Sequence, residues 1–284
     1  MKIHIGLSFS AFVVMHLFAI AGRGETVSIA MDSLPSAQGW AYTQSYTTFP
    51  ESNVFTLQDG QLHINTIEKG LFSCGYQYTN FAMSSSSPFS FSMRVALRGY
   101  EVREAGSRTG FGIFFWSGTE VYLLALNADG LSTQVLHGFP DSNLIPFDTG
   151  LMHDYRMEVV PGTGYKLYVD DVLVDVGVGQ NDTSATNTVV FGDLAGASNS
   201  AADIASFSFF QAPQLKLSKQ GRVVTPSFSY LTTGTNYQLQ ISTNLATWSN
   251  QGSAFTATNR SMDYPLAWNV DNGESLFFRL TLVP

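Results

Sequence analysis

The strongest pattern along this chain is the alternation of apolar and polar residues in short runs. Runs rich in Val, Ile, Phe, Tyr and Thr are separated by clusters of Gly, Asp, Asn and Ser. A side-chain period of two indicates β-strands with one buried face, because successive side chains of a strand point to opposite sides. Strands are predicted over 26–31, 53–57, 61–65, 75–81, 89–98, 110–116, 121–127, 131–136, 154–160, 165–169, 172–176, 188–191 and 204–210. No amphipathic helix of ordinary length is visible, so the pattern predicts an all-β sandwich of two packed sheets.

The registers of two hairpins follow from their turns. Asp59 and Gly60 form a typical two-residue hairpin turn. The predicted cross-strand pairs are Leu57–Leu62 and Phe55–Ile64 on an apolar face, with Thr56–His63 on the other. Asp170 and Asp171 close the second hairpin. Its predicted pairs are Val169–Val172, Leu167–Val174 and Tyr165–Val176, with Lys166 across from Asp175 on the opposite face.

The chain is expected to contain two domains, with a boundary near Ala212-Pro213. Residues 25–211 form the larger one, and residues 214–284 hold enough strand-like runs for a small sandwich. Trp248 follows a strand and a short turn in this second part. We expect its side chain to fill the core of the small sandwich.

Residues 1–21 have the features of a signal peptide. Lys2 precedes an apolar run over 3–20, and Ala19-Ile20-Ala21 matches the small-residue pattern of a cleavage site. The alternative is a membrane anchor, because the apolar run approaches the roughly 20 residues that cross a bilayer. The cleavage pattern directly after the run favours export, to the cell surface, the periplasm of a bacterium or the medium.

Composition narrows the possible partners. Only 13% of the residues are charged and the formal net charge is −8, which argues against nucleic acid or an anionic membrane as a partner. Cys74 is the only cysteine, so an intrachain disulfide is impossible. Nothing in the spacing pairs Cys74 with His63 as a catalytic base, and we interpret it as a small buried side chain.

Several segments of the larger part resemble known domains. The run YRMEV at 155–159, the turn PGTG at 161–164 and the run YKLYVDDVLV at 165–174 resemble the central hairpin of laminin-G and pentraxin-like domains. Residues 191–193 (FGD) and 204–209 (IASFSF) look like the closing part of the same group, the concanavalin A-like lectins and glucanases. The resemblance implies a jelly-roll sandwich over 25–211, and a fold of this kind supports many functions.

The C-terminal part resembles a small fibronectin-like module found at the ends of exported bacterial proteins. The matching runs are YQLQISTNLATW at 237–248 and LFFRL at 276–280. Such modules usually act as spacers or attachment units, so the resemblance implies no catalysis in this part.

Carboxylates in a catalytic arrangement are not evident. The glucanases of the resembled group carry the string Glu-x-Asp-x-x-Glu, which is absent here. Glu101 and Glu104 would face opposite sides of a regular strand. Asp154 and Glu158 share a strand face with Arg156 between them, but their backbones would lie about 13 Å apart. Glycosidases need carboxyl groups about 5 Å or about 6.5–9.5 Å apart, so a solvated charge ladder is the favoured interpretation over catalysis.

Aromatic residues are the other feature that could bind a sugar. Phe114 and Trp116 share one strand face and Phe111, Ile113 and Phe115 the other, so one of these faces must be core. The ligand-contacting residues that we predict are Trp116 and Tyr122, with Arg98 and Tyr100 as further candidates.

A structural calcium ion is a further expectation, implied by the resemblance to folds that hold Ca²⁺ at a sandwich edge. The oxygen-rich positions that match are Asp32, Asp193 and Asp203. The alternative is that these aspartates serve turns or are simply exposed.

The sequence therefore favours a non-catalytic carbohydrate-binding or surface-adhesion protein that recognises an extracellular polysaccharide or a cell-surface glycan. The alternatives are an exported glycan-degrading hydrolase or lyase with a diverged active site, and a structural envelope component without a small ligand.

Export is directly testable. N-terminal sequencing of the mature protein from the culture medium or the periplasm should give a start near Gly22, because the Ala19-Ile20-Ala21 pattern precedes it. An intact Met1 on protein in the membrane fraction would contradict cleavage.

Overall fold

The structure, a computed structural model, describes residues 25–46, 48–70, 72–79, 87–102, 110–133, 144–182, 188–194, 198–220, 223–265, 268–269 and 277–283. The chain divides into a large unit, Val27–Phe210, and a small unit that contains Gln211–Pro284. No helix in these described ranges is long and apolar enough to cross a membrane. The predicted signal peptide, residues 1–21, lies outside them.

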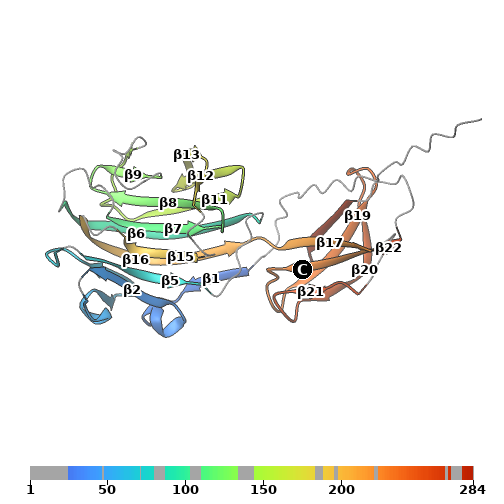
Figure 1. Ribbon diagram of the computed structural model, residues 1–284, viewed down its shortest axis with the longest axis horizontal. Coiled ribbons are helices and arrows are strands. Elements are labelled where there is room, and N and C mark those ends of the chain that lie inside the picture. Colours follow the sequence, from blue (N-terminus) through green and yellow to red (C-terminus); the bar gives the residue numbers. More distant parts are fainter. Residues whose placement is uncertain are drawn as a thin grey trace, which may run out of the picture. The chain divides into compact units, whose positions relative to one another are not determined.

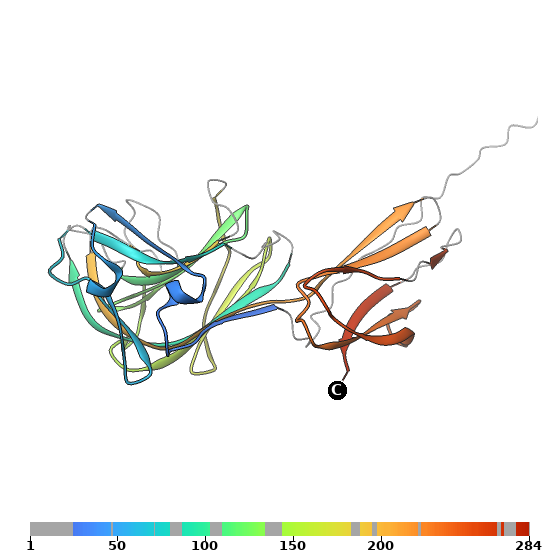
Figure 2. The same ribbon diagram turned by 90° about the horizontal axis from the view of Figure 1, so that it is seen from below.

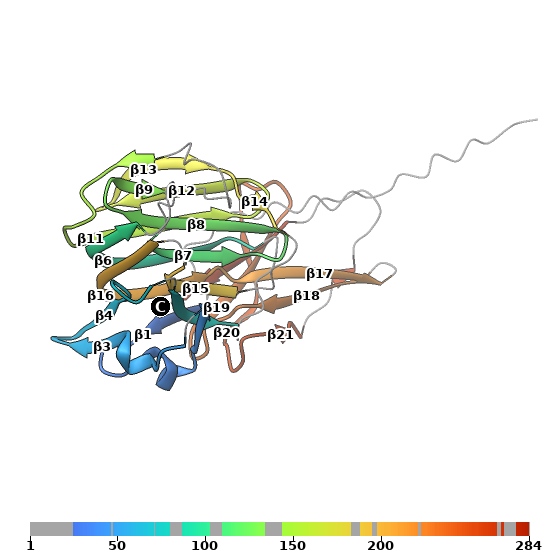
Figure 3. The same ribbon diagram turned by 60° about the vertical axis from the view of Figure 1, so that its left-hand side comes forward.

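The first sheet of the large unit, sheet I, has eight antiparallel strands (Figures 1 and 3). Their order is β13 (Val172–Gly177), β12 (Gly164–Val169), β11 (His153–Val160), β6 (Phe89–Val102), β16 (Ser198–Gln211), β4 (Gln61–Asn65) and β3 (Phe55–Gln58), with β1 (Glu25–Ile29) also pairing with β16. Neighbours such as β6 and β16 are far apart in sequence, so the sheet depends on long-range pairing.

The second sheet, sheet II, also has eight strands and lies face to face with sheet I (Figure 2). Its order is β10 (Leu144–Pro146), β9 (Gly130–Ser132), β8 (Glu120–Asn127), β7 (Phe111–Trp116), β15 (Thr188–Asp193), β5 (Phe72–Tyr78) and β2 (Ala41–Tyr46), with β14 (Gln180–Asn181) pairing with β8. Two short 3₁₀ turns, η1 (Pro35–Gln38) and η2 (Glu51–Asn53), flank β2. The large unit is an antiparallel jelly-roll sandwich, and the predicted all-β class is confirmed.

Aromatic rings fill the space between the two sheets. Phe91 on sheet I stacks on Phe115 on sheet II with ring centroids 4.6 Å apart. Phe207 on sheet I stacks on Phe191 on sheet II at 5.0 Å. All four rings are at most 1% exposed, so they remove a large apolar area from water and hold the sheets together.

The first predicted hairpin is confirmed, because β3 and β4 pair in the register that the sequence indicated. Leu57 lies opposite Leu62, and Thr56 lies opposite His63. The turn residues Asp59 and Gly60 have φ angles of 54° and 71°. Positive φ at both central positions is the geometry of the tight turn that matches strand twist.

The second predicted hairpin, between β12 and β13, is correct only next to its turn. A β-bulge shifts the register after Val169–Val172, so that Leu167 lies opposite Asp175 instead of Val174. The predicted Lys166–Asp175 pair is therefore wrong. The side chains that take up the Asp175 carboxylate are Tyr165 and Thr133, whose hydroxyls each donate to it over 2.8 Å.

The small unit consists of two antiparallel sheets. One contains β17 (Gln214–Gln220), β18 (Val223–Ser229), β21 (Met262–Asp263) and β22 (Trp268–Asn269), and the other β20 (Ser249–Thr256), β19 (Asn236–Ser242) and β23 (Phe277–Leu282). Its core is formed by Phe228, Leu231, Tyr237, Leu239, Ala257, Tyr264 and Leu280.

Trp248 is not part of that core, so the prediction for it is wrong. The side chain is half-buried, and its indole N–H donates to the Leu245 carbonyl over 3.2 Å. The guanidinium of Arg279 lies 4.3 Å from the centre of the ring. A polar tip and a cation over its face let the indole stay at the surface, while Tyr237 takes the central position.

The alternation along β7 can be tested with two neighbouring residues. Phe115→Ala empties a fully buried position and should lower the free energy of unfolding of the large unit by about 3–5 kcal/mol. Phe114→Ala removes a half-buried ring of the same size from the other face and should cost clearly less. Denaturant unfolding followed by tyrosine and tryptophan fluorescence measures both, and equal losses would contradict this assignment of the two faces.

Candidate functional site

The outer face of sheet II carries an aromatic pair. Along β7, Phe111, Ile113 and Phe115 are 0% exposed and point into the core. Phe114 and Trp116 point the other way and are half-buried. Their rings are stacked, with centroids 5.4 Å apart and an angle of 13° between the planes. Sequence analysis required one of the two faces to be core, and the structure assigns that role to the face with Phe115.

Most cross-strand neighbours of this pair on the same face are apolar, and Thr188 on β15 is the polar one. Phe114 lies between Leu123 on β8 and Val190 on β15, and Trp116 lies opposite Val121 on β8. We call Phe114, Trp116, Val121 and Val190 the aromatic patch. Each of its four side chains is half-buried, so the patch keeps part of its surface in contact with solvent.

The indole of Trp116 is fixed in orientation by a polar partner. Its Nε1–H donates to the Asp182 carboxylate over 3.1 Å. Asp182 is itself held in place, because its backbone N–H donates to the Thr119 carbonyl and the preceding residue, Asn181, pairs with Glu120. The patch therefore combines a rigid flat ring with a carboxylate at its edge.

Tyr122 does not contribute to this face, which corrects the sequence prediction. In the β7–β8 hairpin Tyr122 lies opposite Phe115 and points into the core, where it is 2% exposed. Burial and a 2.6 Å hydrogen bond to the Glu120 carboxylate raise the pKa of its hydroxyl above the usual range. A ring enclosed in this way is not available to stack on a ligand.

Arg98 and Tyr100 lie on a different sheet from Trp116. Both belong to β6 of sheet I, whereas Trp116 belongs to β7 of sheet II. Tyr100 is half-buried and packs against the core. The four residues predicted to contact a ligand therefore do not form one surface, and only Trp116 lies on the aromatic patch.

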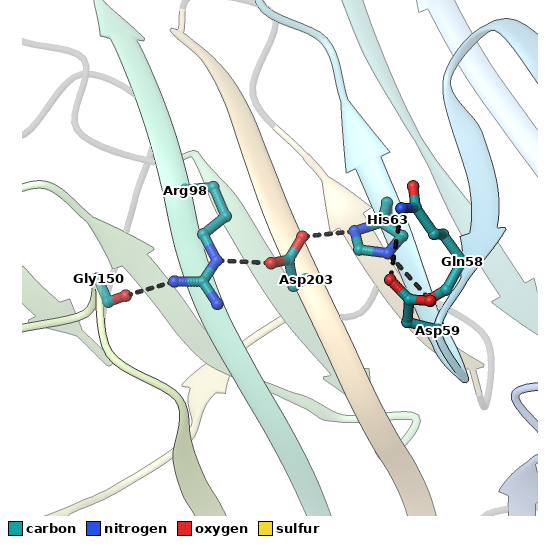
Figure 4. Close-up of polar contacts among 6 residues, drawn as sticks. All are labelled: Gln58, Asp59, His63, Arg98, Gly150 and Asp203. Carbon is teal, nitrogen blue, oxygen red and sulfur yellow. Dashed lines mark hydrogen bonds and ion pairs between the residues drawn. The ribbon is translucent and has the colours of Figure 1, made fainter.

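Arg98 belongs instead to a charged cluster on the outer face of sheet I (Figure 4). Its Nε donates to the Asp203 carboxylate over 2.5 Å, and its Nη1 donates to the Gly150 carbonyl over 3.0 Å. The other oxygen of Asp203 lies 2.6 Å from Nδ1 of His63. The cluster of His63, Asp203 and Arg98 thus spans the adjacent strands β4, β16 and β6. Sequence reasoning missed it, because 140 positions separate His63 from Asp203.

The charge of Asp203 is stabilised within this cluster. Partial burial disfavours the carboxylate, but the hydrogen bonds and charges of Arg98 and His63 outweigh burial and lower the pKa of Asp203. The carboxylate therefore stays ionised and continues to anchor both partners in mildly acidic solution.

His63 is not arranged as a general base. Its Nε2 lies 3.2 Å from the carbonyl oxygen of Gln58 while Nδ1 faces Asp203, so both ring nitrogens face acceptors. A protonated imidazole donates to both acceptors, and a neutral ring can donate to only one. His63 therefore links the Asp203 carboxylate to the Gln58 carbonyl.

The carboxylates on the neighbouring strand β11 form ion pairs, but not as one ladder in which Arg156 joins Asp154 to Glu158. Asp154 lies 2.5 Å from a nitrogen of Arg94, and Glu158 contacts Arg156. Of the other predicted pair, Glu101 accepts a hydrogen bond from the Glu68 N–H, and Glu104 lies outside the described residues.

Cys74 is buried in sheet II, and burial raises the pKa of its thiol above the usual range, as fits a structural side chain.

The three aspartates predicted as calcium ligands do not fit one shared site. Asp203 contacts Arg98 and His63 on sheet I, whereas Asp193 is 0% exposed in sheet II and accepts hydrogen bonds from Thr66 and Ser200. Asp32 is exposed after β1. Within the described ranges, no three His, Cys, Asp or Glu side chains gather where they could hold a metal ion. A calcium ion stays a prediction, and these carboxylates do not form its ligand set together.

Comparison with known proteins adds information on the fold. No protein-family profile and no curated protein matches the chain. Among solved structures, the β-glucanase of Bacillus licheniformis matches with 11% identity and a TM-score of 0.43, over 66% of this chain and 99% of that one. The family 7 alginate lyase AlgAT5 matches with 14% identity and a TM-score of 0.40, over 58% and 85%.

Other matches are larger proteins of which this chain spans only a part. It covers 43% of a botulinum neurotoxin type C chain, with 10% identity and a TM-score of 0.40. It covers 19% of a sialidase, with 14% identity and a TM-score of 0.45. All four matches share at most 14% of their residues with this chain and have TM-scores of 0.45 or less, so no function is inferred from them.

The ionised state of Asp203 has a consequence for stability at low pH. A carboxyl with a lowered pKa in the folded state stabilises the fold above its unfolded-state pKa of about 3.9, and that stabilisation is lost as pH falls through the lower folded-state value. The free energy of unfolding of the large unit should therefore drop less below about pH 5 in Asp203→Asn than in the unmodified protein. Denaturant unfolding at a series of pH values measures the difference, and parallel curves would contradict the assigned role.

Proposed function

We propose that this chain is an exported carbohydrate-binding protein that holds an extracellular polysaccharide or a cell-surface glycan without cleaving it. The observation that carries the proposal is the stacked pair of Phe114 and Trp116, which points away from the core on the outer face of sheet II. Core packing accounts for Phe115 and Tyr122 but not for this outward pair.

The physical basis is the match between a sugar ring and the aromatic patch. The C–H faces of a sugar are apolar and can lie on a flat ring, whereas its hydroxyl groups need hydrogen-bonding partners. Trp116 supplies the flat surface, and the carboxylate of Asp182 at its edge is an acceptor within reach of a neighbouring hydroxyl. Because the indole is already fixed, little side-chain entropy is lost on binding.

The state of the carboxylates supports binding over hydrolysis. A glycosidase needs one carboxyl that can donate a proton and a second one close to the same bond. Asp154, Glu158 and Asp203 are instead all ion-paired with arginines. Such pairing occupies these carboxylates with cationic partners, and it lowers the pKa of Asp203, which makes that residue a poor acid.

The proposal is tested by removing the patch from the folded protein. Trp116→Ala should weaken the affinity for a glycan, first identified on an array, by about tenfold or more, as for other central aromatic anchors. The control is Tyr168→Ala, which removes a half-buried ring from sheet I. Titration calorimetry measures the affinities, and far-UV circular dichroism checks the fold.

Two results would contradict the proposal. Unchanged affinity in a folded Trp116→Ala protein would remove the aromatic patch from the binding site. Release of reducing ends or unsaturated products from the bound glycan would replace binding with the alternative hydrolase or lyase function.

A further inference from the structure

We infer that Arg98, on the outer face of sheet I, is a second site, which binds the carboxylate or sulfate groups of an acidic polysaccharide. The site lies on the opposite sheet from the aromatic patch and uses different chemistry. It rests on the proposed function only in taking a glycan as the ligand.

The first observation concerns the donors that Arg98 still has available. A guanidinium carries five N–H groups. One Nε–H is used by Asp203 and one Nη1–H by Gly150, and the side chain is 47% exposed. The remaining three N–H groups form part of a planar fork, the geometry that binds carboxylate or sulfate oxygens in pairs.

The second observation is that the guanidinium is held in position before any ligand arrives. Asp203 fixes one edge and Gly150 the tip, and Asp203 is itself only 19% exposed and anchored by His63 (Figure 4). An arginine on a free surface would lose side-chain freedom on binding, and this loss offsets much of the gain. Arg98 avoids most of that cost.

The third observation is the distribution of charge on this face of sheet I. Arg94 pairs with Asp154, and Arg156 pairs with both Glu158 and Asp171. These arginines are therefore neutralised by carboxylates of their own.

Arg98 lacks such a partner of its own, because it shares Asp203 with His63. Two basic side chains thus face one carboxylate. Asp59 lies in the hairpin turn beside His63 and accepts a hydrogen bond from Gln58 (Figure 4), and Asp148 accepts a hydrogen bond from the Gly150 N–H. When His63 is protonated, the cluster has a surplus of positive charge in a chain whose net charge is −8. An anion at Arg98 would compensate that surplus.

A polymer fits this site better than a small anion. Hydrogen bonds to a charged group contribute about 1.5–3 kcal/mol, which is less than the roughly 4 kcal/mol of a millimolar complex, so a free ion would be held weakly. Ser90 and Ser92 lie on the same face of β6, opposite Glu158 and Arg156 on β11. Their hydroxyls offer partners for sugar hydroxyls along a chain that follows β6, and several weak contacts on one polymer add up to useful affinity.

The test compares polymers that differ in charge alone. Polygalacturonate should bind the folded protein, and its fully methyl-esterified form should bind at least about tenfold more weakly, because esterification removes the carboxylates that pair with Arg98. Dextran sulfate and dextran form the matching pair for sulfate groups. Affinity gel electrophoresis measures the binding of all four polymers. The ionic strength is kept low because salt screens exposed charges.

The variants separate Arg98 from general electrostatic attraction. Arg98→Gln should weaken binding of the acidic polymer by about ten- to hundredfold, the range expected for hydrogen bonds to a charged group. Arg94→Gln removes the same charge from the same strand, but at a position already neutralised by Asp154, and should leave binding nearly unchanged. Arg98→Lys keeps the charge without the fork and should fall in between. Unfolding curves show whether each variant folds. If Arg98→Gln does not fold, Arg98→Lys replaces it in the comparison with Arg94→Gln.

Several outcomes would overturn the inference. The first is an equal loss of binding in Arg98→Gln and Arg94→Gln. The second is unchanged binding in Arg98→Gln. The third is that the unmodified protein binds neither acidic polymer more tightly than its neutral form. Trp116→Ala distinguishes the two sites. If Trp116→Ala abolishes binding of the acidic polymer while Arg98→Gln does not, the aromatic patch is supported and the Arg98 site is refuted.

Discussion

The rest of the structure depends on the packing of aromatic rings between sheets I and II. Phe91 on Phe115 and Phe191 on Phe207 link strands that are far apart in sequence, and each pair joins one sheet to the other. With a single cysteine the chain has no intrachain disulfide to supplement this core. Because strand side chains alternate, fixing Phe115 inward also fixes Phe114 and Trp116 outward. The position of the candidate ligand surface is thus a consequence of the core.

Local turn chemistry decides how much of this fold the sequence reveals. The β3–β4 register was predictable because Asp59 and Gly60 permit only a tight turn and both strands show a clear alternation. The β12–β13 register was not, because its bulge brings Asp175 to hydroxyls of Tyr165 and Thr133. Thr133 lies on a distant segment of the chain. Contacts between distant segments cannot be predicted from the pattern of neighbouring residues.

The candidate sites show the same limit. Trp116 was found by alternation, but Tyr122 was misplaced because its register opposite Phe115 was not worked out across the 117–119 turn. Pairing Trp116 with Val121 would have assigned Tyr122 to the core. The cluster around Asp203 had no local signal at all, since its partners come from strands that meet only in the folded sheet. Asp203, expected to bind a metal cation, instead contacts the side chains of Arg98 and His63.

The two outer faces of the sandwich differ in a way that bears on function. On sheet II the aromatic patch places aromatic and aliphatic side chains beside the polar Thr188, whereas the outer face of sheet I carries the ion pairs of Arg94, Arg98 and Arg156. Only 13% of the chain is charged, and these ion pairs place several of the charges on one face. Exposed ion pairs contribute little to the stability of the fold. An outward-facing aromatic pair also contributes less to that stability than a buried pair does. Neither face is explained by folding alone, and each has the chemistry to bind a different part of a glycan.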